Sequence, residues 1–289
     1  MMDFRAILAG LAFAIMWSSA FTSARMIVAE APPLTALTAR FLISGMIGVG
    51  IALALGQSFR LNRAQWRATI VFGVSQNALY LGLNFVAMQW VQASLAAIIA
   101  SAMPLLVALL GWLFMGQRLR PLGVFGMLAG VSGVVLIMGA RLSGGVDPLG
   151  VAMCLVAALA LAAATLSVKG ASSGGNVMMI VGLQMFIGAA ILSVPALLFE
   201  DFTVHWSPRL IGAFSYTVLV PGVLATWVWF WLVARIGAVK ASTFHFLNPF
   251  FGVAVAAVLL SERVGPLDVL GVVVIAAGIL AVQISRAAL

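Results

Sequence analysis

Long apolar segments, each about the length of a membrane-spanning helix, follow one another from residue 4 to residue 285 of this chain. At about 1.5 Å rise per residue, ~20 apolar residues cross the ~30 Å hydrocarbon layer as a helix. The composition agrees, because 64% of the residues are hydrophobic and 8% are charged, against roughly 45–50% and about 25% in an ordinary soluble domain. These values exclude a water-soluble globular protein and predict an all-α polytopic membrane protein.

Charged residues, prolines and glycine clusters divide the chain into ten candidate spans. The first is not a signal peptide, because its apolar run exceeds the roughly 7–15 residues of a signal core and lacks a small-residue cleavage site before Arg25. The lone cysteine, Cys154, lies in an apolar run, which excludes a disulfide framework and a cysteine-based metal site. We expect no metal and no cofactor. The spans are 4–24, 33–55, 68–89, 93–115, 122–140, 149–168, 177–199, 209–234, 240–260 and 266–285.

The basic residues predict how these spans are oriented. If the N-terminus is cytoplasmic, ten Lys and Arg fall in inner segments and four in outer ones, while Arg40 lies inside a span. Such a bias follows the positive-inside rule and predicts a bacterial cytoplasmic (inner) membrane protein with both termini cytoplasmic. The acids divide the other way, with Asp3 inside and the rest outside. The basic residues are scattered, so the net charge of +8 does not indicate nucleic-acid binding. The inner ten are Arg5, Arg60, Arg63, Arg67, Arg118, Arg120, Lys169, Arg235, Lys240 and Arg286, and the outer four are Arg25, Arg141, Arg209 and Arg263.

An internal repeat relates the two halves of the chain. The segment from Pro104 to Arg141 matches the segment from Pro249 to Arg286 at a constant offset of 145, with prolines, glycines and arginines in register. The chain therefore divides into two five-helix units, 1–141 and 142–289. Because five is odd, the second unit must enter the membrane from the opposite side, so we predict ten transmembrane helices as two inverted five-helix repeats. This architecture is common in secondary transporters, with the substrate site between the halves.

Several motifs resemble the drug/metabolite transporter superfamily, and within it the ten-helix EamA-type exporters. They are Trp17-Ser18-Ser19, Arg40-Phe41, the block from Ala93-Ser94 through Pro104 to Gly116-Gln117, and the block from Ala241-Ser242 through Pro249 to Ser261-Glu262. Gln117 departs from the family pattern, which often has Glu there. Among such exporters the chain looks most like bacterial aromatic amino-acid exporters. The resemblance implies export from the cytoplasm through a central cavity shared by the first, third, fourth, sixth, eighth and ninth helices.

Two spans carry a proline near their middle, Pro104 and Pro249. Proline lacks an amide proton and crowds the carbonyl four residues earlier. Irregular backbone at membrane depth is tolerated where protein or a water-filled cavity satisfies it. The pair therefore indicates bending points beside a midplane site, or kinks that serve packing alone.

Polar residues follow one face of two spans. In the third span Asn77, Tyr80 and Asn84 share a face, and in the ninth His245 and Asn248 lie beside the proline. Amides facing lipid are costly without partners, so these faces indicate a wet cavity or hydrogen bonds between helices. Ser101 belongs to a small-residue face of the fourth span, which suits lining or close packing.

The tryptophans divide by depth. Four lie near span ends, where interfacial anchoring explains them: Trp66, Trp90, Trp112 and Trp206. Trp17, Trp227, Trp229 and Trp231 lie deeper. We expect Trp17 and Trp227 to line the site, where their rings could stack on a planar substrate, and Trp229 to meet lipid.

Two ionisable groups lie well inside spans, Arg40 and His245. Arg40 could bind a substrate carboxylate, lock the halves together as a gate, or reach backbone carbonyls or the interface. His245 could couple transport to protons or stay neutral and hydrogen-bonded. No span carries a carboxylate near its middle, so we expect export without tight proton coupling.

We therefore predict a secondary transporter that exports small amphipathic metabolites, above all aromatic and other neutral amino acids, by alternating access. Its partners are a small-molecule substrate and the bilayer, and we expect one chain to suffice. The expected substrate-binding residues are Trp17, Tyr80, Asn84, Ser101, Trp227, His245 and Asn248, with Arg40, Pro104 and Pro249 as gating or hinge residues. Alternatives are a proton-coupled multidrug or nucleoside/purine effluxer, a channel, and an intramembrane enzyme. The chain lacks the HExxH, GxSxG and P-loop motifs that an enzyme would need.

Overall fold

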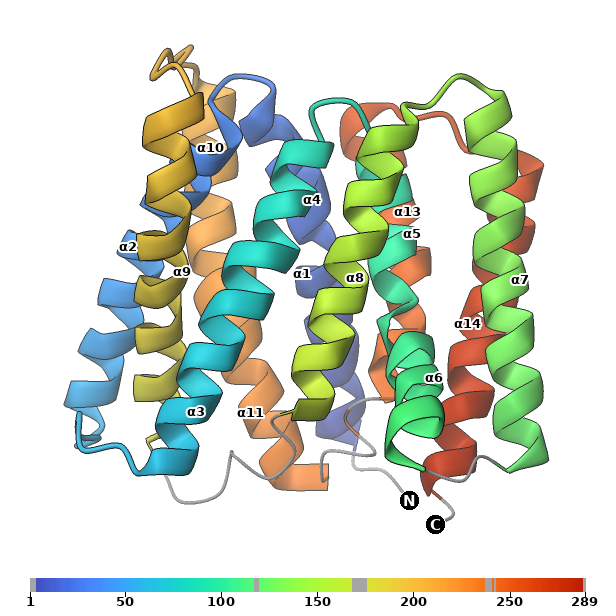
Figure 1. Cartoon of the computed structure of the whole chain (residues 1–289), viewed down its shortest axis with the longest axis horizontal. Coiled ribbons are helices and arrows are strands. Elements are labelled where there is room, and N and C mark those ends of the chain that lie inside the picture. The colour runs from blue at the N-terminus through green and yellow to red at the C-terminus, as the bar shows by residue number, and fades with distance from the viewer. Residues whose placement is uncertain (1–3, 117–119, 168–175, 237–240, 242, 288–289) are drawn as a thin grey trace.

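The computed structural model describes residues 4–116, 120–167, 176–236, 241 and 243–287. These residues form helices and short connections without any β-strand, and the helices stand side by side in one bundle (Figure 1). Six spans are single helices: α1 (Phe4–Val28), α2 (Pro33–Ala54), α7 (Pro121–Ser143), α8 (Pro148–Ser167), α9 (Val177–Phe199) and α14 (Pro266–Ala287).

The other four spans are interrupted near their middle. Spans 3 and 8 each contain a π-helical segment: span 3 is α3 (Arg63–Phe72), η1 (Gly73–Leu81) and α4 (Gly82–Ala87), and span 8 is α10 (Pro208–Thr217), η2 (Val218–Leu224) and α11 (Ala225–Ile236). Span 4 is α5 (Ala93–Ser101) and α6 (Met103–Met115), and span 9 is η3 (Thr243–Leu247), a 3₁₀ turn, and α13 (Asn248–Leu260).

The predicted ten-helix membrane architecture is confirmed. Eight spans are long and apolar enough to cross a bilayer, and shorter apolar helices at Pro148–Ala163 and Phe244–Leu260 supply the other two. The surface of the bundle suits a lipid environment. Large apolar side chains such as Phe114 and Phe199 are about four-fifths exposed (80% and 82%), whereas the polar Asn77 and Ser94 are buried. This is the reverse of a water-soluble fold.

The two halves run through the bundle in opposite directions. We call the end at which α1 begins and α14 finishes the lower end, as drawn in Figure 1, and the other the upper end. α1 starts at the lower end and its repeat mate α8 starts at the upper end. Mate spans also pack on each other: α2 on α9, α7 on α14, and span 4 on span 9 through α5 and α13. The arrangement is that of an inverted repeat.

Small residues allow these mates to approach closely. A Cβ atom built on Gly278 of α14 would lie 2.5 Å from the carbonyl oxygen of Gly126 on α7, and one on Gly182 of α9 would lie 2.8 Å from the backbone nitrogen of Val49 on α2. Neither separation leaves room for a side chain. The α7–α14 and α2–α9 contacts are therefore glycine-dependent seams of the kind that replaces hydrophobic driving force in membranes.

The paired prolines lie where the helices are interrupted. Pro104 is the second residue of α6 and Pro249 the second residue of α13. A proline costs little in the first turn of a helix, since its missing N–H would have no partner there. The prolines thus restart the helix on the far side of each break. Their role as hinges stays a prediction.

Candidate substrate cavity

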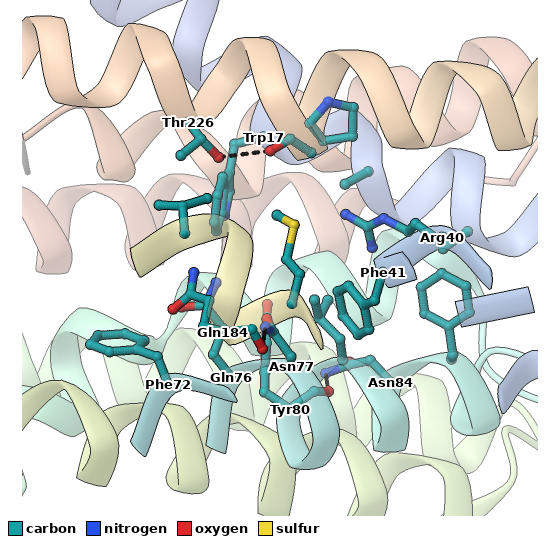
Figure 2. A pocket seen from close by; sticks show the side chains of 18 of the residues that line it. Trp17, Arg40, Phe41, Phe72, Gln76, Asn77, Tyr80, Asn84, Gln184 and Thr226 are labelled. Carbon is teal, nitrogen blue, oxygen red and sulfur yellow. Dashed lines mark hydrogen bonds between the residues drawn. The ribbon is translucent and has the colours of Figure 1, made fainter. Parts of the chain in front are cut away.

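A cavity of about 720 Å³ lies among spans 1, 2, 3, 7 and 8 (Figure 2). Its wall combines aromatic rings with side-chain amides and one guanidinium. The rings are those of Trp17, Phe21, Phe41, Phe72, Tyr80, Phe85 and Trp229, the amides those of Gln76, Asn77, Asn84 and Gln184, and the cation is Arg40. A mostly apolar pocket of this size with a few placed polar groups is typical of a small-molecule site. The lining residues include no carboxylate among those that the structure describes.

The π-helical segments place the amides. Asn77 and Tyr80 belong to η1, and its repeat mate η2 contributes Pro221 and Gly222 to the opposite wall. π-segments open the regular backbone pattern and occur frequently at functional sites. The Asn77 side-chain amide donates to the carbonyl oxygen of Gln184 at 2.8 Å, which ties span 3 to span 7 across the cavity wall.

Asn84 keeps a free acceptor at the cavity. Its side-chain nitrogen donates to the carbonyl oxygen of Tyr80 at 2.7 Å, whereas its Oδ1 atom is buried and has no partner. A buried polar atom without a partner is costly unless a ligand or water meets it. Asn84 is therefore able to accept a hydrogen bond from a bound molecule.

Arg40 faces the cavity from α2 and is 6% exposed. Its Nε atom is buried without a partner, and its guanidinium carbon lies 5.5 Å from the centre of the neighbouring Phe41 ring. The sequence left three alternatives to substrate binding for Arg40: a lock between the halves, a contact with backbone carbonyls, and an interfacial position. None of them is seen among the described residues.

A second, much smaller pocket of about 30 Å³ adjoins the first and shares Trp17, Phe21 and Tyr80 with it. Ser101, Pro104, His245 and Asn248 line this second pocket. The side-chain nitrogen of Asn248 lies 2.9 Å from Nδ1 of His245, and the His245 ring packs edge-on against Phe13 with 5.4 Å between ring centres. The predicted residues of spans 4 and 9 therefore lie behind the main cavity, while Trp17, Tyr80 and Asn84 line it.

The sequence-based assignment of Trp227 and Trp229 is wrong. Trp227 is 55% exposed on the outside of the bundle, whereas Trp229 lines the cavity and its ring centre lies 5.0 Å from that of Phe13. In a regular helix of 3.6 residues per turn, Trp227 would share a face with Tyr216. The π-segment η2 has wider turns, so it rotates α11 relative to that count.

The set of helices implied by the family resemblance also needs correction. Spans 2 and 7 line the main cavity, whereas spans 4, 6 and 9 line the small pocket. Gln76, Gln184 and Thr226 were missed. Gln184 is a polar side chain in the middle of an apolar span, which is the signal that would have identified it.

The cavity is closed at its upper end and, as far as the described residues show, open toward its lower end. Near the upper end, Ala24, Phe85 and Met88 are 1–2% exposed, and a guanidinium nitrogen of Arg25 on α1 donates to the carbonyl oxygen of Met88, which follows α4. Lining residues nearer the lower end, such as Val177, are only partly buried.

The helices also pack more closely at the upper end than at the lower end. α1, α2 and α4 pack pairwise at the upper end. Their repeat mates α8, α9 and α11 touch at isolated points at most, as far as the described residues show. The upper contacts thus form a closed gate, and no equivalent closed gate is seen at the lower end among the residues that the structure describes.

Carboxylates fasten the halves together at the upper end. Glu200 accepts from the backbone nitrogens of Leu34 and Thr35, both at 2.7 Å, at the start of α2. At the lower end Gln57, three residues after α2, makes the corresponding cap on α9, where its Oε1 accepts from the backbone nitrogen of Met179 at 3.0 Å. The two caps are related by the repeat, but one is an acid and the other a neutral amide.

Two further fastenings follow this pattern. Glu262 accepts from the backbone nitrogens of Ala93 at 2.8 Å and Ser94 at 3.0 Å, and Asp268 pairs with Arg141 through nitrogen–oxygen contacts of 2.9 and 3.0 Å. At the lower end the positions 145 residues earlier hold Gln117, which lies outside the described residues, and Gly123. The positions equivalent to Glu262 and Asp268 therefore carry no acid, and these two ionic fastenings have no counterpart at the lower end by sequence.

Comparison with known proteins identifies the family of this chain. The profile of the EamA-like transporter family matches residues 4–139 and 148–284, once in each half. The uncharacterized transporter YvbV of Bacillus subtilis is 27% identical over 249 residues, covering 86% of this chain and 81% of that protein. The uncharacterized inner membrane transporter YedA of Escherichia coli (strain K12) is 26% identical over 268 residues, covering 91% and 86%.

One similar protein carries a substrate in its name. The aromatic amino acid exporter YddG of Ancylobacter novellus is 35% identical over 141 residues, which is 48% of each chain. A protein of solved crystal structure superposes with a TM-score of 0.70 at 21% identity, covering 97% of this chain and 98% of its own. At that identity the superposition speaks for the fold alone.

Proposed function

We infer the substrate and the direction of transport from the premise that this chain belongs to the EamA-like transporter family and is a multi-pass membrane transporter. We propose that it exports small amphipathic metabolites, above all aromatic and other neutral amino acids. The observation that carries this proposal is the cavity lined by rings and amides within an inverted repeat. The half-length similarity to an aromatic amino acid exporter supports it.

The wall suits an amphipathic planar molecule. Trp17, Phe72 and Trp229 supply ring faces, and aromatic stacking has preferred geometries that add to simple burial. Gln76 and Gln184 supply donors and acceptors beside them. A cavity of about 720 Å³ holds an amino acid with accompanying water. It is complete within one chain, which supports a functional monomer.

The direction follows from the basic residues. The sequence puts ten Lys and Arg on the side of the N-terminus and four on the other side, and α1 begins at the lower end, which supports a cytoplasmic lower end and cytoplasmic termini. The open end of the cavity then faces the cytoplasm. This is the loading state of an exporter, and the two halves of the inverted repeat supply an outward-open state by exchanging which gate is closed.

The absence of a lining carboxylate among the described residues supports transport without tight proton coupling. His245, the remaining proton-binding candidate, lines the small pocket behind Trp17. In liposomes we expect substrate counterflow to proceed without a pH gradient. Accumulation that requires a pH gradient and is lost in His245→Ala would contradict this and favour the proton-coupled effluxer.

Two neighbouring tryptophans provide the test of the substrate. In cells challenged with toxic analogues of aromatic amino acids, nucleosides or cationic drugs, we expect protection against the amino-acid analogues. Trp229→Ala should weaken aromatic flux by roughly 2- to 10-fold, the equivalent of one ring pairing, and Trp227→Ala should leave it unchanged. Protection against nucleosides or drugs without protection against amino-acid analogues refutes the proposal.

A further inference from the structure

Arg40 has no internal partner for its charge. It makes no hydrogen bond or ion pair with the residues that the structure describes, its Nε atom is buried, and the side chain faces the main cavity. An unpaired ion in a membrane interior is expensive, and such residues as a rule serve a ligand or ion path. The position therefore calls for an anion that the protein itself does not provide there.

Most of the acids that the structure describes are engaged elsewhere. Glu200 and Glu262 cap helices, and Asp268 pairs with Arg141, all at the upper end. Glu30 accepts from Ser207, and Asp147 accepts from the backbone of Gly150. Asp201, which is exposed beyond the end of α9, is not among the cavity-lining residues. No described carboxylate is placed to neutralise Arg40.

The one charged side chain among the described lining residues lies at one end of the cavity, beside the Phe41 ring. Figure 2 shows Arg40 and Phe72 at opposite ends of the pocket, with Trp17 between them. Arg40 lies next to Phe41 and near the closed gate, while Phe72 ends the lower segment of span 3. A molecule with an anionic head and a ring would fit this wall in one orientation, head toward the gate.

We propose that Arg40 is the anion-binding residue of the cavity and that the transported compounds must carry a carboxylate. The inference rests on the proposed function and narrows it, because it excludes amines and amides of the same ring. A guanidinium presents paired N–H donors that match the two oxygens of a carboxylate, and lysine cannot reproduce that geometry. Arg40 thus determines which end of the substrate enters first.

The test uses purified protein in liposomes and four related compounds: phenylalanine, phenylalaninamide, 3-phenylpropanoate and 2-phenylethylamine. Each is offered in counterflow to the wild type, Arg40→Lys, Arg40→Gln and the control Arg209→Gln, an exposed cation on α10. The wild type and the control should move the two carboxylates at least about tenfold faster than their neutral or cationic analogues. Arg40→Gln should lose this preference, and Arg40→Lys should retain part of it.

A second readout needs no variant. Ligand binding stabilises the folded protein in proportion to its affinity, so the carboxylates should raise the unfolding temperature of the wild type more than phenylalaninamide does. Equal shifts, or an Arg40→Gln protein that keeps the wild-type preference, overturn the inference. If 3-phenylpropanoate moves in an Arg40-dependent way but no amino acid moves, the proposed function fails and the anion site stands. If amino acids move equally well in the Arg40 variants, the proposed function stands and the anion site fails.

Discussion

The two ends of this bundle are related by the repeat and yet differ in two respects. The upper end is closed, with α1, α2 and α4 in contact, and carries carboxylates that cap helices or pair with arginine. The lower end is open as far as the described residues show, and there a neutral amide, Gln57, caps the start of α9. An ideal inverted repeat would favour neither state. The difference therefore identifies the features that bias this chain toward one of them.

The helix caps and the gate have different roles: the caps stabilise the contact between the halves, and the gate closes the cavity. The Glu200 cap belongs to the α2–α9 seam, which glycines hold closely packed at Gly48 and Gly182. The gate instead consists of buried side chains at the upper end and the bond from Arg25 to the Met88 carbonyl. Changes at the gate should redistribute the open states, whereas changes in the seam should alter stability.

The largest expected effect is the sidedness of labelling. In a Cys154→Ala background, Val177→Cys near the open end and Gln184→Cys deeper in the cavity should react with a membrane-impermeant thiol reagent from the cytoplasm and not from outside. The reason is that the upper gate blocks entry. Gln89→Cys, on the exposed upper connection, serves as the external control. Reaction of both cavity cysteines from outside alone would invert the proposed orientation.

The sequence was sufficient for the architecture because length, charge and repetition carry it. Ten apolar runs and an offset of 145 between Pro104 and Pro249 fix the number of spans and their inverted relation. Asn77, Tyr80 and Asn84 were also predicted to share a face, and all three line the cavity. Their positions hold because polar groups in a span must avoid lipid whatever the local helix type.

The remaining site details depended on backbone irregularity and on packing. The π-segment η2 exchanged the roles of Trp227 and Trp229, and a helix-period count cannot anticipate such a segment. Pro221 in the middle of span 8 was a signal that could have warned of it. Which gate is closed depends on contacts between segments far apart in sequence, such as Arg25 with Met88, and no local pattern encodes these.

Phe85→Ala should open the closed end most strongly among the side-chain changes. Phe85 is 2% exposed near the upper end of the cavity, and removing a buried phenylalanine costs about 3 kcal/mol or more, roughly a hundredfold in an equilibrium. External labelling of Gln184→Cys should then become readily measurable. Phe199→Ala, an 82% exposed phenylalanine at the same end, is the matched control. Equal labelling in both variants would show that Phe85 does not close the gate.

Arg25→Gln should have a smaller effect of the same sign. It removes a charged donor to the Met88 carbonyl, and hydrogen bonds to charged groups contribute about 1.5–3 kcal/mol, roughly tenfold or more in the gate equilibrium. The rate of external labelling at Gln184→Cys measures it. Arg25→Lys keeps a charged donor and should restore most of the closed state. A lysine variant as open as the glutamine variant would assign the effect to side-chain shape instead of the hydrogen bond.

The smallest effect is expected when the two caps of the α2–α9 seam are exchanged, an acid for an amide and the reverse. Glu200→Gln should lower the free energy of unfolding by about 1 kcal/mol, because a carboxylate at a helix N-terminus interacts with the helix dipole as well as with the N–H groups. Gln57→Glu should raise it by up to a similar amount, since Gln57 already contacts the Met179 nitrogen at 3.0 Å. Unfolding of the purified protein in detergent measures both.

Asp201→Asn is the control, because it removes an adjacent exposed carboxylate and should change the free energy of unfolding little. If it costs as much as Glu200→Gln, the stabilisation comes from general surface charge rather than from the cap. Neither seam variant should alter external labelling of Gln184→Cys, because the glycine contacts keep α2 and α9 together whichever gate is open.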